Sequence, residues 1–156
     1  MKIKILFLGK TKEAYLAEGI ADFASRLKHF TKIEIIELKD LGKKKNLSNN
    51  QIMEGEGNIL LNATTKNSLL VALDSRGRMK SSEDFSQIIQ EWEQQGTKDI
   101  TFVIGGSLGL DPTVKAKAHY LLSLSKMTFT HEMVRLLLME QLFRAYSIKE
   151  GTKYHK

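Results

Sequence analysis

Two junctions that each join a strand to a loop and then to a helix lie close together between residues 101 and 130. The first follows the apolar run Thr101–Ile104, passes through the glycine-rich loop Gly105–Gly109, and reaches a helix start at Asp111–Pro112. The second follows the apolar run Tyr120–Leu124 and passes through the loop Ser125–Phe129. In an open α/β sheet such loops lie at the carboxyl ends of the strands, where ligands bind. This stretch therefore predicts an α/β sheet that presents two loops to a ligand.

The rest of the chain alternates between the same two kinds of segment. Apolar runs of strand length are followed by amphipathic segments of helical period. The alternation predicts a mostly parallel sheet with helices on both faces, in a single domain over residues 1–156. We expect strands at Lys2–Leu8, Ile33–Leu38, Ser68–Leu73, Ile100–Ile104 and Tyr120–Leu124. Besides the helix that starts at Asp111–Pro112, we expect helices at Thr11–Lys28, from a capping box at Ser48–Gln51 to Leu61, from Ser81 or Ser82 to about Gln95, and at Thr130–Ile148, with a loop at Ser75–Lys80.

The expected last helix, Thr130–Ile148, is apolar on more than one face. A helix on the surface needs only an apolar stripe, so this one must be buried on several sides. Either it is threaded through the core of one chain or it packs against a second subunit. The small sheet offers few places to bury a helix completely, which favours a dimer interface.

Charge and composition narrow the class of function. The formal net charge is +6, which favours a polyanionic partner. The triplet Lys43–Lys45 is either a solvated surface segment or an RNA contact. The chain has no cysteine, and its four histidines lack metal-ligand spacing, so we expect no metal site. The N-terminal apolar run Ile5–Leu8 is too short for a signal peptide or a membrane span, so we expect a cytoplasmic protein without membrane contact.

The glycine loop does not match the common nucleotide-binding patterns. Its form, Gly105-Gly106-x-x-Gly109, is neither the dinucleotide fingerprint G-x-G-x-x-G nor a phosphate loop, since no Gly-Lys-Ser/Thr follows. Glycines here would either let the backbone approach a flat ligand closely or simply form a tight turn before Asp111.

Three segments together point to a family. Val71–Phe85 reads VALDSRGRMKSSEDF, Phe102–Asp111 reads FVIGGSLGLD, and Leu122–Lys156 reads LSLSKMTFTHEMVRLLLMEQLFRAYSIKEGTKYHK. The combination of GG-x-x-GL, S-K-M-T-F-x-H, R-A-Y-S-I and a terminal Y-H resembles the bacterial SPOUT methyltransferases that methylate ring nitrogen 3 of a pseudouridine in 23S ribosomal RNA. The resemblance covers nearly the whole chain.

This resemblance implies an α/β fold with a C-terminal trefoil knot, a rare exception to the rules of chain threading. It also implies an enzyme that acts on 23S rRNA within the assembled ribosome and uses S-adenosyl-L-methionine bound by three loops at the strand ends. Together with the apolar last helix, we expect this enzyme to work as a homodimer. Adenine would lie between Leu73, Leu124 and Met127, and Gly105 would remove a side chain that blocks the ligand. Carried onto this sequence, the cofactor-binding residues are Leu73, Gly105, Gly106, Gly109, Leu124, Ser125, Lys126, Met127, Thr128 and Phe129.

The reaction also needs groups that act on the RNA base. The target imide N–H must lose its proton before the nitrogen can attack, so a base or a group that stabilises negative charge on the neighbouring carbonyls is required. The candidates are His131, Arg135, Arg144, Tyr154 and His155. Arg144, Tyr154 and His155 match positions that the family uses at its site. Arg135 is alternatively a phosphate contact or an ion-pair partner of Glu132 or Glu140, and the base is not assigned.

Other functions fit the sequence less well. A SPOUT enzyme that acts on another rRNA base or on tRNA is the nearest alternative, because only the motif match separates the two. A ribosome-binding factor without catalysis would not need an open cofactor slot. A Rossmann-type oxidoreductase lacks both its glycine fingerprint and the acid that follows it.

Overall fold

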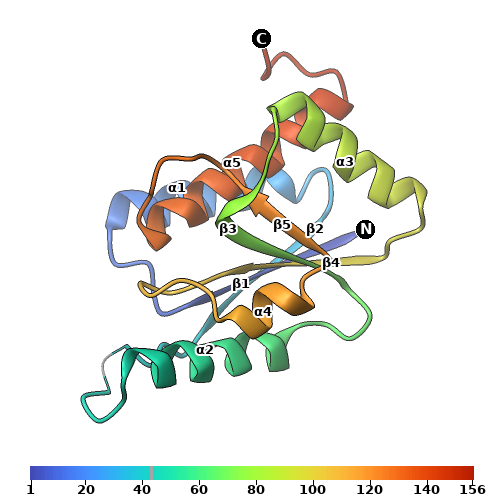
Figure 1. The fold of residues 1–156 in the computed structure, drawn as a ribbon. Coiled ribbons are helices and arrows are strands. Elements are labelled where there is room, and N and C mark those ends of the chain that lie inside the picture. The colour runs from blue at the N-terminus through green and yellow to red at the C-terminus, as the bar shows by residue number, and fades with distance from the viewer. Residues whose placement is uncertain (43) are drawn as a thin grey trace.

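The computed structural model describes residues 1–42 and 44–156, and its strands form one five-stranded sheet (Figure 1). The strand order is β2-β1-β4-β3-β5, and each neighbouring pair runs parallel. This confirms the predicted parallel sheet. Lys43 of the predicted lysine triplet lies outside the described residues. The strands are β1 (Lys2–Leu8), β2 (Lys32–Leu38), β3 (Leu69–Met79), β4 (Asp99–Ile104) and β5 (Tyr120–Ser123).

Helices cover both faces of the sheet, as the alternation predicted. On one face α5 lies between α1 and α3, whereas α2 and α4 pack together on the other face (Figure 1). In the part of the chain that the structure describes, no helix is long and apolar enough to cross a membrane. The helices are α1 (Ala14–Leu27), α2 (Asn49–Ala63), α3 (Ser82–Gln94), α4 (Pro112–Lys117) and α5 (His131–Lys149).

Short polar side chains begin α2, α4 and α5. Ser48 accepts a hydrogen bond from the backbone N–H of Gln51, whose side chain accepts from the backbone N–H of Ser48, so the predicted capping box is present. Asp111 caps α4 by accepting from the Thr113 N–H at 2.9 Å. Thr130 caps α5 in the same way. These caps satisfy N–H groups that have no partner within the helix.

Helix α5 is buried mainly by its own chain. It crosses the sheet face between α1 and α3, and its side chains Leu138 and Leu142 are fully buried. The packing against α1 is close, because a Cβ on Gly19 would lie 2.8 Å from a methyl carbon of Leu136. The apolar character of α5 on several faces is thus explained within one subunit, and this character alone does not require a second. The trefoil knot implied by the resemblance stays a prediction.

The predicted loop at Ser75–Lys80 is wrong for most of its length, because β3 continues to Met79. The strand first pairs with β5 up to Leu73, then bulges, and resumes at Arg78, which pairs with Leu122. The missing side chain of Gly77 allows β3 to pair with β5 again after the bulge, since a Cβ there would lie 2.7 Å from the backbone of Leu121. The exposed, polar residues of this segment carry no strand pattern of their own. Their strand conformation comes from the pairing with β5.

Candidate functional site

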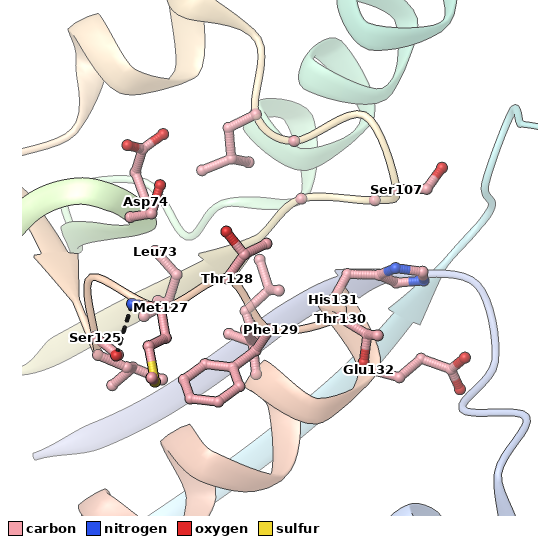
Figure 2. A pocket seen from close by; sticks show the side chains of 18 of the residues that line it. Leu73, Asp74, Ser107, Ser125, Met127, Thr128, Phe129, Thr130, His131 and Glu132 are labelled. Carbon is pink, nitrogen blue, oxygen red and sulfur yellow. Dashed lines mark hydrogen bonds between the residues drawn. The ribbon is translucent and has the colours of Figure 1, made fainter.

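A cavity of about 730 Å³ opens beside the bulge of β3 and the carboxyl ends of β4 and β5 (Figure 2). Its wall is formed by β3 where the bulge begins after Leu73, by the glycine loop after β4, and by the loop after β5 that leads into α5. Among the described residues, the exposed side chain of Lys126 is the one predicted contact that is not part of the wall. The other nine predicted cofactor-binding residues line it, and they are Leu73, Gly105, Gly106, Gly109, Leu124, Ser125, Met127, Thr128 and Phe129.

The glycine loop is a tight turn whose two ends touch. The Gly109 N–H donates to the Gly106 carbonyl at 3.0 Å, and Gly109 has a φ of +83°, which glycine adopts without strain. A Cβ on Gly105 would lie 2.6 Å from the Gly109 carbonyl carbon and 2.9 Å from the Leu110 nitrogen. The missing side chain of Gly105 therefore leaves room for the backbone of Gly109 and Leu110. This corrects the expectation that its missing side chain makes room directly for the ligand.

The hydroxyl of Ser123 connects the two other loops of the cavity. Ser123 is buried, and its Oγ lies 3.1 Å from the Ser75 carbonyl oxygen and 3.0 Å from the Ser125 carbonyl oxygen. Its single proton can serve one of these acceptors at a time. Within the second loop, the Ser125 hydroxyl accepts from the Met127 N–H at 2.9 Å (Figure 2). The mouth of the cavity is thus held by short polar side chains.

Several wall residues were missed by the sequence analysis. Glu13, Tyr15 and Leu16, at the start of α1, reach the cavity from a segment that carries no motif. Asp74 also lines it, and its carboxylate pairs with Lys115 at 3.3 Å. Asp74 could have been found from its position directly after the buried apolar run that ends at Leu73. The contribution of α1 could not, because it depends on how α1 packs beside α5.

His131 begins α5 and faces the cavity (Figure 2). It is half-buried. Burial lowers the pKa of His131, and the nearby positive charge of Arg135 lowers it further. The neutral imidazole is therefore favoured, and a neutral imidazole can accept a proton.

Arg135 has a structural role, so the expected phosphate contact and the expected ion pair with Glu132 or Glu140 are both wrong. Its side chain is only 1% exposed, and its guanidinium donates to the carbonyls of Leu8 and Gly9 and to the Thr11 hydroxyl, at 2.6, 3.1 and 2.9 Å. The guanidinium carbon also lies 4.0 Å from the centre of the Phe7 ring. Arg135 ties α5 to the end of β1. It is too buried to contact a phosphate, and no ion pair to it is present among the described residues.

The remaining predicted catalytic residues lie elsewhere. Arg144, Tyr154 and His155 gather near the C-terminal end of α5, where Tyr154 and the Arg144 guanidinium both hydrogen-bond Glu140. Arg144 and His131 are 13 positions apart on one helix. At about 1.5 Å per residue this places them roughly 20 Å apart along the helix axis. One chain therefore does not bring all four predicted catalytic residues together.

A buried carboxylate, that of Glu56, lies beside the glycine loop. Glu56 of α2 is 4% exposed, and it accepts from the Leu41 N–H at 3.0 Å. Its second oxygen would lie 3.0 Å from a Cβ on Gly106. Burial raises the pKa of Glu56, and the Leu41 hydrogen bond offsets part of this rise.

Replacing Glu56 by glutamine should stabilise the protein above neutrality by about 1 kcal/mol. The raised pKa means that the folded state binds this proton more tightly than the unfolded state, so stability falls as pH rises through that pKa. The glutamine side chain keeps an acceptor for the Leu41 N–H without the buried charge. Urea unfolding should show no such gain in the free energy of unfolding below pH 4.5, the ordinary pKa of a glutamate carboxyl group. The exposed Glu54→Gln on the same helix is the matched control, and an equal gain in both variants would contradict this account.

Comparison with known proteins agrees with this architecture. A family model described as predicted SPOUT methyltransferase matches residues 1–155. A relative from Desulfotalea psychrophila, named ribosomal RNA large subunit methyltransferase H, is 50% identical over 156 residues and both chains are covered completely. A relative of the same name from Streptococcus sanguinis is 46% identical over 159 residues, again with complete coverage of both.

Solved structures of low sequence identity share the fold. A probable methyltransferase from Bordetella pertussis aligns with a TM-score of 0.58 at 10% identity, over 93% of this chain and 96% of its own. A probable methylase family protein from Haemophilus influenzae aligns with a TM-score of 0.53 at 18% identity, over 99% of this chain and 70% of its own. Within the described residues, no group of three or more His, Asp or Glu side chains could hold a metal ion.

Proposed function

The chain belongs to the SPOUT methyltransferase family, and from this we propose that it transfers a methyl group to a base of large-subunit ribosomal RNA. The observation that carries the proposal is the cavity beside the bulge of β3 and the carboxyl ends of β4 and β5. It is built from the same three loops that the motif resemblance assigns to the cofactor, in a chain that matches the family over residues 1–155. Relatives of 46% and 50% identity over their full length carry the name of an rRNA methyltransferase.

The cavity suits S-adenosyl-L-methionine in size and chemistry. Its volume of about 730 Å³ is within the usual range for a small-molecule site. Leu73, Leu124 and Met127 offer apolar surface for an adenine ring, and the loop backbones offer N–H and C=O groups to its edge. When bound, this group supplies an electrophilic methyl carbon. The chain's own task is to hold it in line with the RNA nitrogen, because orientation supplies much of the rate.

The proposed target is ring nitrogen 3 of a pseudouridine, which must lose a proton. His131 is placed at the cavity wall in a form that can accept one. Arg144 offers a fixed positive charge that could stabilise the negative charge that develops on the base carbonyls. Tyr154 and His155 complete the set carried over from the family.

The two groups of predicted catalytic residues would act together in a homodimer. Four large apolar side chains at the cavity mouth are exposed, which is unusual for a surface that stays in water. These side chains are Tyr15 (62% exposed), Met127 (75%), Phe129 (39%) and Leu108 (36%). A second copy of the chain that covers them would also bring its own C-terminal tail to this mouth.

Transfer of labelled methyl groups distinguishes this proposal from its alternatives. Purified protein and methyl-labelled S-adenosylmethionine should label 23S rRNA in ribosomes that lack the modification, and should leave tRNA unlabelled. The net charge of +6 predicts that activity falls steeply with added salt. Label in tRNA instead would move the substrate to the nearest alternative. Cofactor binding without transfer to any RNA would favour a binding factor.

A further inference from the structure

The last residues of the chain turn back along α5 through a defined helix end. Gly151 has a φ of +66°, and its N–H donates to the Ile148 carbonyl. The next N–H, of Thr152, donates to the Ser147 carbonyl at 2.9 Å. This pair of bonds is a Schellman motif, which reverses the direction of the chain. Tyr154 and His155 are thereby returned to the side of Arg144.

Glu140 fixes two of these side chains. One oxygen of its carboxylate accepts from the Arg144 Nε at 3.0 Å and from the Tyr154 hydroxyl at 3.0 Å. The Tyr154 ring packs edge-on against Phe143 at 4.7 Å between centroids, and the Arg144 guanidinium carbon lies 4.8 Å from the Tyr154 ring centre. Arg144 and Tyr154 are therefore held by α5 itself.

His155 is held from a different helix. Its Nε2 lies 2.8 Å from an oxygen of Glu83, in the first turn of α3, and its Nδ1 lies 3.3 Å from the Arg144 Nη1. An arginine can only donate, so Nδ1 must be the acceptor in that contact. A neutral imidazole then carries its proton on Nε2 and donates it to Glu83. The arrangement specifies one tautomer and one orientation of the His155 ring.

We propose that Glu83 is a positioning residue that sets the tautomer and orientation of His155 for methyl transfer. This inference rests on the proposed function, because it assumes that the C-terminal tail takes part in the reaction. Glu83 is exposed, and its carboxylate contacts the tail at His155. Glu83 is not among the residues that line the cavity, so it would act through His155. The same hydrogen bond also places the tail on the surface in an ordered form, ready to be presented to a partner.

The chain offers closely matched variants for a test. Glu83→Ala removes the acceptor, whereas Glu83→Gln keeps a carbonyl oxygen that can accept from Nε2. Asp84→Ala is the control, since Asp84 is exposed and its carboxylate lies in the same first turn, near the positive end of the helix dipole. All four proteins are prepared at full length with ¹⁵N-labelled histidine.

Two measurements are made on each protein. The ¹⁵N shifts of the His155 ring and the relaxation of the backbone amides of residues 152–156 report its tautomer and order without any substrate. Steady-state methyl transfer to ribosomes gives kcat and the KM for S-adenosylmethionine. Glu83→Ala should mix the tautomers, increase tail motion, and lower kcat about tenfold at unchanged KM, the scale of one hydrogen bond to a charged group. Glu83→Gln and Asp84→Ala should stay within about twofold of the wild type, well below that tenfold scale.

Each other outcome would overturn the inference. A His155 tautomer and tail order unaffected by Glu83→Ala would show that Glu83 does not hold the ring. A loosened tail with unchanged kcat would show that its position does not matter for the reaction. A wild-type protein that transfers no methyl group to any RNA would overturn the proposed function itself, and the step that Glu83 serves with it.

Discussion

Gly105→Ala should weaken binding of S-adenosylmethionine at least about 100-fold, because the added methyl group has no room. Its Cβ would lie 2.6, 2.8 and 2.9 Å from three backbone atoms of Gly109 and Leu110. Backbone atoms cannot rotate away as the end of a side chain can, so the turn from Gly106 to Gly109 must move. That turn forms one wall of the cavity. Isothermal titration calorimetry on the purified variant measures the loss.

The control for Gly105→Ala is Ser107→Ala at the exposed tip of the same loop. Ser107 lines the cavity and is exposed, and the change to alanine removes only its hydroxyl, so the variant should bind within a few-fold of the wild type. Thermal unfolding of both variants separates a local shift of the loop from loss of the fold, and we expect a cost of about 1–3 kcal/mol for Gly105→Ala. Wild-type affinity in Gly105→Ala would show that the loop does not shape the cofactor site.

Arg135→Met should lower the free energy of unfolding by about 3–5 kcal/mol, the largest stability change we expect from one substitution. The methionine fills part of the volume but leaves the carbonyls of Leu8 and Gly9 without their donors in a buried place. It also removes the charge that lies over the Phe7 ring. Urea unfolding followed by circular dichroism measures the change.

Two further variants make the Arg135 result specific. Arg135→Lys keeps the charge, but its compact ammonium group lacks the planar fork that spans the carbonyls of Leu8 and Gly9 and the Thr11 hydroxyl, so the loss should be about half as large. Arg26→Met is the matched control, because the Arg26 side chain is 48% exposed and forms a surface pair with Asp22 at 2.8 Å. Such pairs contribute less than about 1 kcal/mol. Equal losses in Arg135→Met and Arg26→Met would contradict the structural role of Arg135.

Features with a local chemical signal could be predicted from the sequence. The capping box at Ser48, the helix start at Asp111–Pro112 and the apolar strand runs all depend on neighbouring residues, and each is present in the structure. The loops at Gly105–Gly109 and Ser125–Phe129 were also placed correctly at one cavity. In parallel sheets the strand ends meet at one edge, so local signals there carry over to the site.

Features that depend on partners distant in the sequence could not be predicted. Arg135 is a charged residue within a helix, and nothing near it indicates that it reaches the end of β1, more than 120 residues away. The continuation of β3 to Met79 depends on its pairing with β5. The separation of Arg144 from His131, by contrast, follows from 13 positions on one expected helix, and the match to the family's motif grouped these residues by function without regard to that distance.

The measurement that tests the central claim most directly is the position of the methyl group. Ribosomes that lack the modification, and naked 23S rRNA in parallel, are incubated with the protein and labelled S-adenosylmethionine, and the labelled nucleotide is identified by mass spectrometry. We predict a methyl group on ring nitrogen 3 of a pseudouridine, in assembled ribosomes only, because we expect the shape of the ribosome to supply part of the specificity. A methyl group on another base, or no transfer despite measurable cofactor binding, would contradict the account.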